Sequence, residues 1–119
     1  MPWELKNDRP IYLQLMEQIS YHIISGEYSI GSKLPSVRDL AAESSVNPNT
    51  MQKALSELER SGLIFTNRTS GRFITEDAAM IQTMKLDLAK KELQNFLKQL
   101  QKLGFNEQEV KQFIIEQVK

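Results

Sequence analysis

Apolar residues recur along the start of the chain with the period of an α-helix. Between Pro10 and Gly26 the apolar residues fall three or four positions apart. These residues are Tyr12, Leu15, Ile19 and Ile23. Proline is favoured at the first helical position and glycine just after the last one, so the pattern predicts a first helix over about 10–25.

Two shorter helices are predicted to follow. Ser36 stands at an N-cap position with an acidic residue three places later, and an apolar face over two turns predicts a helix over about 36–44. Asn47 is suited to cap the next helix, and Gly62 is suited to end it in the left-handed conformation. A third helix is therefore expected over about 48–61, after a short turn.

A small β-hairpin is predicted after the third helix. Strand-forming residues cover 63–65 and 73–74, and the segment NRTSG between them has the composition of a turn. The hairpin is expected over about 63–75. The fold class is therefore mainly α with a small β-hairpin, and the order helix, turn, helix, wing is an architecture that reads DNA.

The remaining 43 residues after Glu76 are predicted to form one long and one short helix. No glycine or proline occurs from Asp77 to Leu103, and apolar residues repeat at alternating steps of three and four, as in a coiled-coil seam. Gly104 ends this helix, and Asn106 has the position of a cap for the last one. The apolar residues expected on the two helices include Leu86, Ala89, Leu93, Phe96, Leu100, Leu103, Phe113 and Ile114.

The long seam has more apolar surface than one short partner helix can cover. This favours packing between two subunits through Leu86, Leu93, Phe96, Leu100, Leu103, Phe113 and Ile114, while packing only against the last helix is the alternative. Two domains are therefore expected: a winged helix-turn-helix domain over 1–76 and a helical dimerisation hairpin over 77–119.

The composition excludes several classes of function. There is no cysteine, which removes disulfides, thiolate metal sites and cysteine nucleophiles, and His22 alone cannot form a metal cluster. No nucleophile-base pair or phosphate-cradling glycine loop is present, so neither an enzyme nor a cofactor is expected. No run approaches the roughly 20 apolar residues of a membrane span, and the start lacks the features of a signal peptide, which predicts a cytoplasmic protein.

The formal net charge is zero, so any evidence for nucleic-acid binding must come from the local arrangement of residues. On a helical wheel the third helix has a buried face formed by Met51, Ala54, Leu55 and Leu58. Its opposite face carries Asn49, Gln52, Lys53, Ser56 and Arg60. Amides can bond adenine in the major groove, and cations and hydroxyls can reach phosphates. On periodicity alone, an ordinary solvated helix is the alternative.

Five spaced motifs carry a resemblance to a known family. They are PIYLQ (10–14), G…G…LPSVRDLA (26–41), VNPNTMQKAL (46–55), LERSGLI (58–64) and SGRFI (70–74). In this order and spacing the chain resembles the GntR family of bacterial transcription regulators. The resemblance implies a winged helix-turn-helix protein that binds pseudo-palindromic operators as a dimer.

Carried over by position, the resemblance implies DNA contacts from the second helix, the third helix and the hairpin. Lys53 is added because it lies alongside these positions, and Arg72 because it flanks the tip of the hairpin together with Arg68. The expected DNA-binding residues are Ser36, Arg38, Asn47, Asn49, Thr50, Gln52, Lys53, Arg68, Gly71 and Arg72. Pro48 and Gln52 depart from the pattern, because some relatives have arginine there, and the resemblance therefore implies a different operator sequence.

Several of these residues also have purely structural interpretations. Arg38 could pair with Glu43, Arg68 and Arg72 could be solvated charges of the hairpin, and Lys33 could serve either role. Ser36 and Asn47 are explained as helix caps even without DNA, and capping does not exclude a phosphate contact.

The short tail resembles the YtrA-like subfamily, in which two helices serve for dimerisation and neighbouring genes often encode ABC transporters. We therefore expect a homodimeric repressor, and a small-molecule effector of unspecified identity between the tail helices could alter the spacing of its DNA-reading heads. A winged helix that binds a protein instead of DNA is the alternative, favoured by the neutral net charge. The sequence could also be a piece of a longer regulator.

Overall fold

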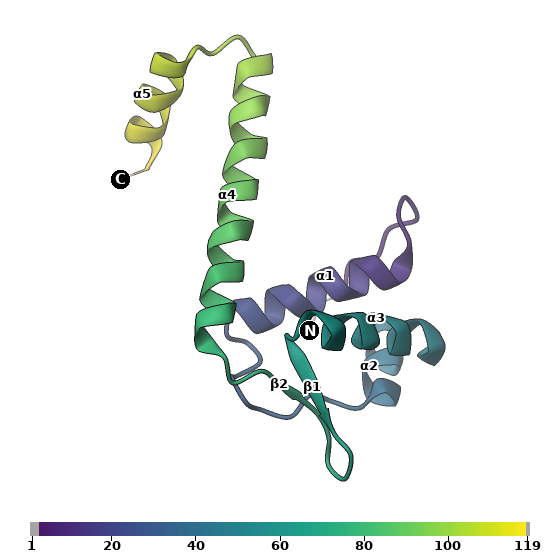
Figure 1. The fold of residues 1–119 in the computed structure, drawn as a ribbon. Helices are drawn as coiled ribbons and strands as arrows, with labels where there is room; N and C mark the ends of the chain where they lie inside the picture. Colours follow the sequence, from purple (N-terminus) through teal and green to yellow (C-terminus); the bar gives the residue numbers. More distant parts are fainter. Residues whose placement is uncertain (1–2, 119) are drawn as a thin grey trace. The chain divides into compact units, whose positions relative to one another are not determined.

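The computed structural model describes residues 3–118, which form five helices and one antiparallel pair of strands (Figure 1). In chain order these are α1 (Ile11–Ile24), α2 (Val37–Ser44), α3 (Pro48–Ser61), β1 (Ile64–Asn67), β2 (Gly71–Ile74), α4 (Ala78–Lys102) and α5 (Glu107–Gln117). The predicted fold class, mainly α with a small hairpin, is confirmed. The chain divides into two compact units, one ending at Gln82 and one beginning at Thr83.

Side-chain caps set the starts of α2 and α3, whereas α1 begins without one. The Ser36 hydroxyl accepts a hydrogen bond from the Asp39 N–H at 3.1 Å, and the Asn47 side chain accepts one from the Asn49 N–H at 2.8 Å. Pro10 is the N-cap and not the predicted first helical residue, since its ψ of 135° still continues the extended incoming segment. These caps satisfy amide groups that a helix start leaves without partners.

Apolar stripes of α1, α2 and α3 form the core of the first unit, together with the base of the hairpin. The buried residues are Leu15, Ile19, Ile23, Leu40, Ala41, Met51, Ala54, Leu55, Leu58, Leu63, Ile64 and Ile74. The buried face predicted for the third helix is therefore confirmed. Full burial of each larger side chain contributes roughly 1.5–3 kcal/mol, so this core fixes which face of α3 remains in solvent.

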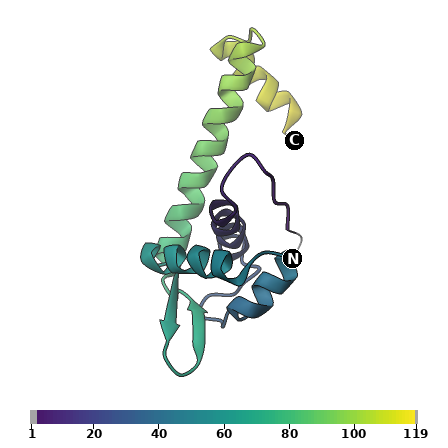
Figure 2. The ribbon, with the colours of Figure 1, turned by 90° about the vertical axis from the view of Figure 1, so that its right-hand side faces the viewer.

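The hairpin is anchored on both edges of β2. On one edge β1 pairs with it in antiparallel register, with Ile64 opposite Ile74 at the buried end. On the other edge the Leu34 N–H donates to the Arg72 carbonyl at 2.9 Å, and the Ile74 N–H donates to the Ser32 carbonyl at 2.8 Å. Only the outer end of the hairpin projects beyond the three helices (Figures 1 and 2).

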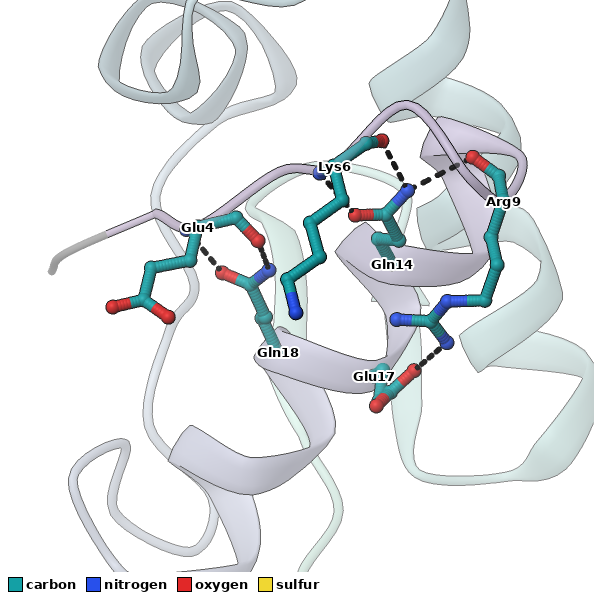
Figure 3. A network of polar contacts seen from close by, with 6 residues as sticks. All are labelled: Glu4, Lys6, Arg9, Gln14, Glu17 and Gln18. Atoms are coloured by element: carbon teal, nitrogen blue, oxygen red, sulfur yellow. Dashed lines mark hydrogen bonds and ion pairs between the residues drawn. The ribbon is translucent and has the colours of Figure 1, made fainter.

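The segment before α1 is bound to that helix by two glutamine side chains that the sequence analysis did not single out (Figure 3). Gln14 is 1% exposed, and its amide accepts from the Lys6 N–H at 2.7 Å and donates to the Lys6 and Arg9 carbonyls, both at 2.8 Å. Gln18 forms the same reciprocal pair with the backbone of Glu4, at 2.7 and 3.2 Å. The two amides therefore pair with the backbone as a neighbouring strand would.

The second unit is built from α4 beyond Gln82 and from α5, which turns back beside the end of α4 (Figure 2). Gly104 has the left-handed φ of +98° that this reversal requires. Asn106 and Glu109 form the predicted cap of α5 as a complete capping box. Leu100 and Val110 are buried within the unit, whereas most of the predicted seam is exposed.

The first turn of α4 packs with the first unit. Ile81 is buried, and the Met80 methyl group would lie 3.6 Å from a Cβ placed on Gly62. The predicted division between 1–76 and 77–119 thus falls at the end of the hairpin, and the compact unit continues into α4.

Candidate nucleic-acid interface

The solvent-facing side of α3 carries polar side chains with few partners in the chain. Asn49, Gln52 and Lys53 are exposed, and Thr50 is half-buried beside them. The Gln52 amide donates to the Ser56 hydroxyl at 3.2 Å along the same helix. The structure therefore brings together amides and a cation near the amino end of α3, where the helix dipole also favours anions.

Arg38 is an exposed cation on the short helix that precedes α3. Within the described residues it forms no ion pair or side-chain hydrogen bond, so the alternative pairing with Glu43 is not present. Ser36 begins the same helix and keeps an exposed side chain. A guanidinium without a carboxylate partner can donate up to five hydrogen bonds to an anion.

A groove of about 720 Å³ runs between the start of α2 and the hairpin. Its lining includes three cations, Lys33, Arg38 and Arg72, against one acid, Asp39. This local excess of positive charge contrasts with the zero net charge of the chain. Arg72 is paired with Glu59, so Lys33 and Arg38 are the cations that this groove offers to a phosphate backbone.

Gly71 brings Lys33 close to the hairpin backbone. Its φ of +110° lies in the left-handed region, and a Cβ there would lie 3.1 Å from the Lys33 Cε. The backbone conformation favours glycine at this position, and a Cβ would also require the flexible end of the Lys33 side chain to shift. Lys33, whose role the sequence leaves open, thus lies directly against the hairpin and lines the groove.

The two arginines of the hairpin differ in their surroundings. Arg68 lies exposed in the turn, which is stabilised by hydrogen bonds from the Thr69 N–H and hydroxyl to the Asn67 side chain at 3.1 and 3.0 Å. The Arg72 Nε instead donates to the Glu59 carboxylate at 2.7 Å, and its side chain is 21% exposed. The structure therefore leaves Arg68 available for a ligand and pairs Arg72 internally.

Sequence reasoning missed two residues that act on this face. The Tyr12 ring of α1 lies beneath the ammonium of Lys53, and Glu59 of α3 binds the hairpin. The motif PIYLQ contains Tyr12 but does not reveal its partner, and nothing local to Glu59 indicates the hairpin contact.

His22 belongs to a structural cluster at the end of α1. Its ring contacts the Glu27 carboxylate and lies 5.9 Å from the Tyr28 ring, between centroids. Partial burial lowers the pKa of His22 below 6.5. Among residues 3–118 there is no group of three acidic, histidine or cysteine side chains arranged to hold a metal ion, and no helix there has the length and apolar character to cross a membrane.

Comparison with known proteins gives consistent matches. Residues 11–74 match the sequence model of bacterial regulatory proteins of the gntR family. The chain is 41% identical over 107 residues to the HTH-type transcriptional regulator YhcF of Bacillus subtilis, covering 90% of this chain and 88% of that protein. It is 39% identical over 93 residues to the HTH-type transcriptional repressor YtrA of the same organism, covering 77% and 72%.

Solved structures agree with these sequence matches. A GntR family transcriptional regulator from Listeria monocytogenes superposes with a TM-score of 0.85 at 37% identity, covering 97% of this chain and all of that one. The DNA-binding domain of AraR, solved in complex with an operator, superposes with a TM-score of 0.55 at 28% identity, covering 63% of this chain and 90% of that one.

Proposed function

The chain belongs to the GntR family of bacterial regulatory proteins, and from this premise we propose that it is a homodimeric, sequence-specific DNA-binding repressor of the YtrA type. The observation that carries the proposal is the exposed polar face of α3 beside a cationic groove. It acts in the bacterial cytoplasm, where it occupies a promoter, such as that of an ABC transporter operon.

Each part of the surface has a distinct role in the proposed complex. The amides of Asn49 and Gln52 read base edges in the major groove, and Arg38 and Lys53 bind phosphates. Arg68 at the hairpin turn enters the adjacent minor groove. The proposed contacts further include Ser36, Asn47, Thr50 and Gly71.

The proposed dimer forms through the apolar residues of the second unit. Leu86, Leu93, Phe96 and Leu103 are exposed, the last at 73%. Phe113 and Ile114 are half-buried and Leu100 is buried, so these three support the interface from within the chain. Such exposed apolar surface favours self-association, and a symmetric dimer places two heads on the two half-sites of an operator.

A crevice between α4 and α5 is the proposed site for a small-molecule effector. It has a volume of about 420 Å³ and is lined mainly by apolar side chains, with Lys111, Glu107 and Gln101 at its polar positions. This size and lining are typical of sites for small ligands. A ligand that binds one arrangement of the dimer better than another would change operator affinity.

The second candidate function is binding of a protein by the same face of α3. The zero net charge favours it, since non-specific attraction to DNA is then weak. In that case affinity depends little on salt and on Arg38.

The experiment that tests the proposal is selection of bound duplexes from genomic fragments at two salt concentrations. Wild type, Arg38→Ala and a control, Lys6→Ala, are compared, because Lys6 is an exposed cation whose backbone alone takes part in hydrogen bonds. We expect a two-fold symmetric site that is retained by the control and lost with Arg38→Ala. Absence of any enriched site for the folded wild type would contradict the proposal and favour a protein partner.

A further inference from the structure

Glu59 ties both strands of the hairpin to α3. Its Oε1 accepts a hydrogen bond from the Arg72 Nε at 2.7 Å and another from the Thr66 hydroxyl. Thr66 and Arg72 are opposite each other in the register of β1 and β2. One carboxylate oxygen therefore holds a cross-strand pair against the helix.

This contact is better enclosed than the other ion pair of α3. The side chains of Glu59 and Arg72 are 31% and 21% exposed, whereas Arg60 in the Glu57 pair is 80% exposed and its charged atoms lie 3.8 Å apart. The Arg72 carbonyl is also fixed, since it accepts from the Leu34 N–H. Partial enclosure reduces the screening of this ion pair by water and salt. Arg72 is therefore restrained through its backbone, by Leu34, and through its side chain, by Glu59.

The protonation state of Glu59 agrees with this geometry. Partial burial alone would raise the pKa of Glu59, but the hydrogen bonds from Thr66 and Arg72 and the charge of Arg72 bring the pKa below 4.5. The carboxylate is therefore ionised at neutral pH.

We propose that Glu59 is a positioning residue that fixes the hairpin against α3, with Arg72 as its structural partner and not as a phosphate contact. The inference rests on the proposed DNA-binding function. Arg68 is then the hairpin arginine that reaches DNA, and its placement depends on Glu59 although the two residues do not touch.

The test uses Glu59→Gln with Glu57→Gln as the matched control. Both variants remove one negative charge from α3, but Glu57 pairs with Arg60 of its own helix. We expect Glu59→Gln to weaken binding to the selected operator by about tenfold and Glu57→Gln to leave it within about twofold. Arg72→Ala should reproduce the loss without lowering the slope of log affinity against log salt concentration, because no phosphate contact is removed.

Coupling between substitutions of Glu59 and Arg68 distinguishes positioning of Arg68 from a purely structural role of Glu59. Arg68→Ala should cost less affinity in the Glu59→Gln background than in wild type, because the hairpin is then already misplaced. Additive losses would overturn the proposal. So would an Arg72→Ala slope lowered by about 1, the value expected for a lost phosphate contact.

A measurement without DNA separates this inference from the proposed function. Amide hydrogen exchange of residues 65–73 should be faster in Glu59→Gln than in Glu57→Gln, while the core amides of α1 stay protected. If the wild type selects no DNA but this difference in exchange rate appears, the proposed DNA-binding function is wrong, and the positioning of the hairpin by Glu59 is still supported. Equal exchange rates in the two variants would overturn the proposal that Glu59 fixes the hairpin.

Discussion

The ammonium of Lys53 lies 3.9 Å from the centre of the Tyr12 ring, so a cation of α3 rests on an aromatic face of α1. Such a cation–π contact contributes about 0.5–1 kcal/mol at exposed sites. It also restricts the rotamers of a flexible side chain before that side chain meets a phosphate. Preorganisation of this kind lowers the entropic cost of binding.

Replacing Tyr12 tests this restriction. Tyr12→Phe keeps the aromatic face and should leave operator affinity unchanged, whereas Tyr12→Leu should weaken it by about threefold, equivalent to the lost cation–π contact. The slope of log affinity against log salt concentration should stay constant in both Tyr12 variants, since Lys53 keeps its charge. It should fall by about 1 in Lys53→Met. Binding titrations over a salt series measure these quantities. Equal affinities of the two Tyr12 variants would show that the ring does not orient Lys53.

Removing the buried amide of Gln14 should destabilise the fold. Gln14→Ala leaves three backbone groups of Lys6 and Arg9 without their partner, which costs about 1–3 kcal/mol in the free energy of unfolding. Gln18→Ala is the matched control and should cost less than about 1 kcal/mol, because its hydrogen bonds are exposed and water can replace them. Urea unfolding of both variants measures the difference, and equal losses would count against the structural role of Gln14.

An acidic residue on the exposed seam should dissociate the proposed dimer. Leu86 is 51% exposed and does not line the crevice between α4 and α5, so Leu86→Glu should leave each chain folded. A buried carboxylate in the interface is strongly unfavourable, so sedimentation should detect monomers and operator affinity should fall. Gln94→Glu, on the same helix, adds an equal charge at an exposed polar position and should remain dimeric. A dimeric Leu86→Glu variant would place the interface elsewhere.

The lowered pKa of Glu59 makes part of the stability depend on pH. Because its folded value lies below the unfolded value of 4.5, the carboxylate stabilises the fold above about pH 4.5, and the stabilisation is lost as the pH falls through the folded value. The difference in unfolding free energy between wild type and Glu59→Gln should therefore be constant near neutral pH and shrink below pH 4.5. Urea unfolding across this range measures it, and a difference independent of pH would contradict the assignment.

The sequence determines the local elements better than the contacts between them. The predicted limits of the third helix, 48–61, are those of α3, because Asn47 and Gly62 act as caps through their immediate neighbours. The partners of Gln14 are backbone groups whose position depends on the path of the preceding segment, so a polar residue at that spacing gives no sign of burial. Glu59 and Arg72 meet only once the hairpin has folded back.

The DNA-binding roles assigned to individual residues remain predictions. Their positions agree with exposure on one face of the first unit, but exposure alone does not distinguish a base contact from a phosphate contact. Arg72 is an example, since its place beside the hairpin tip predicts a DNA contact while its side chain pairs with a carboxylate of the same chain.

Gly71 limits the sequences that this surface can accept. Its positive φ strains any residue that has a Cβ, and such a residue would also displace the flexible end of the Lys33 side chain. A library randomised at position 71 and selected for operator binding should return glycine almost alone, whereas the neighbouring exposed Ser70 should accept many residues. A residue without a side chain therefore restricts the sequence at the tip of this hairpin more strongly than its exposed neighbour does.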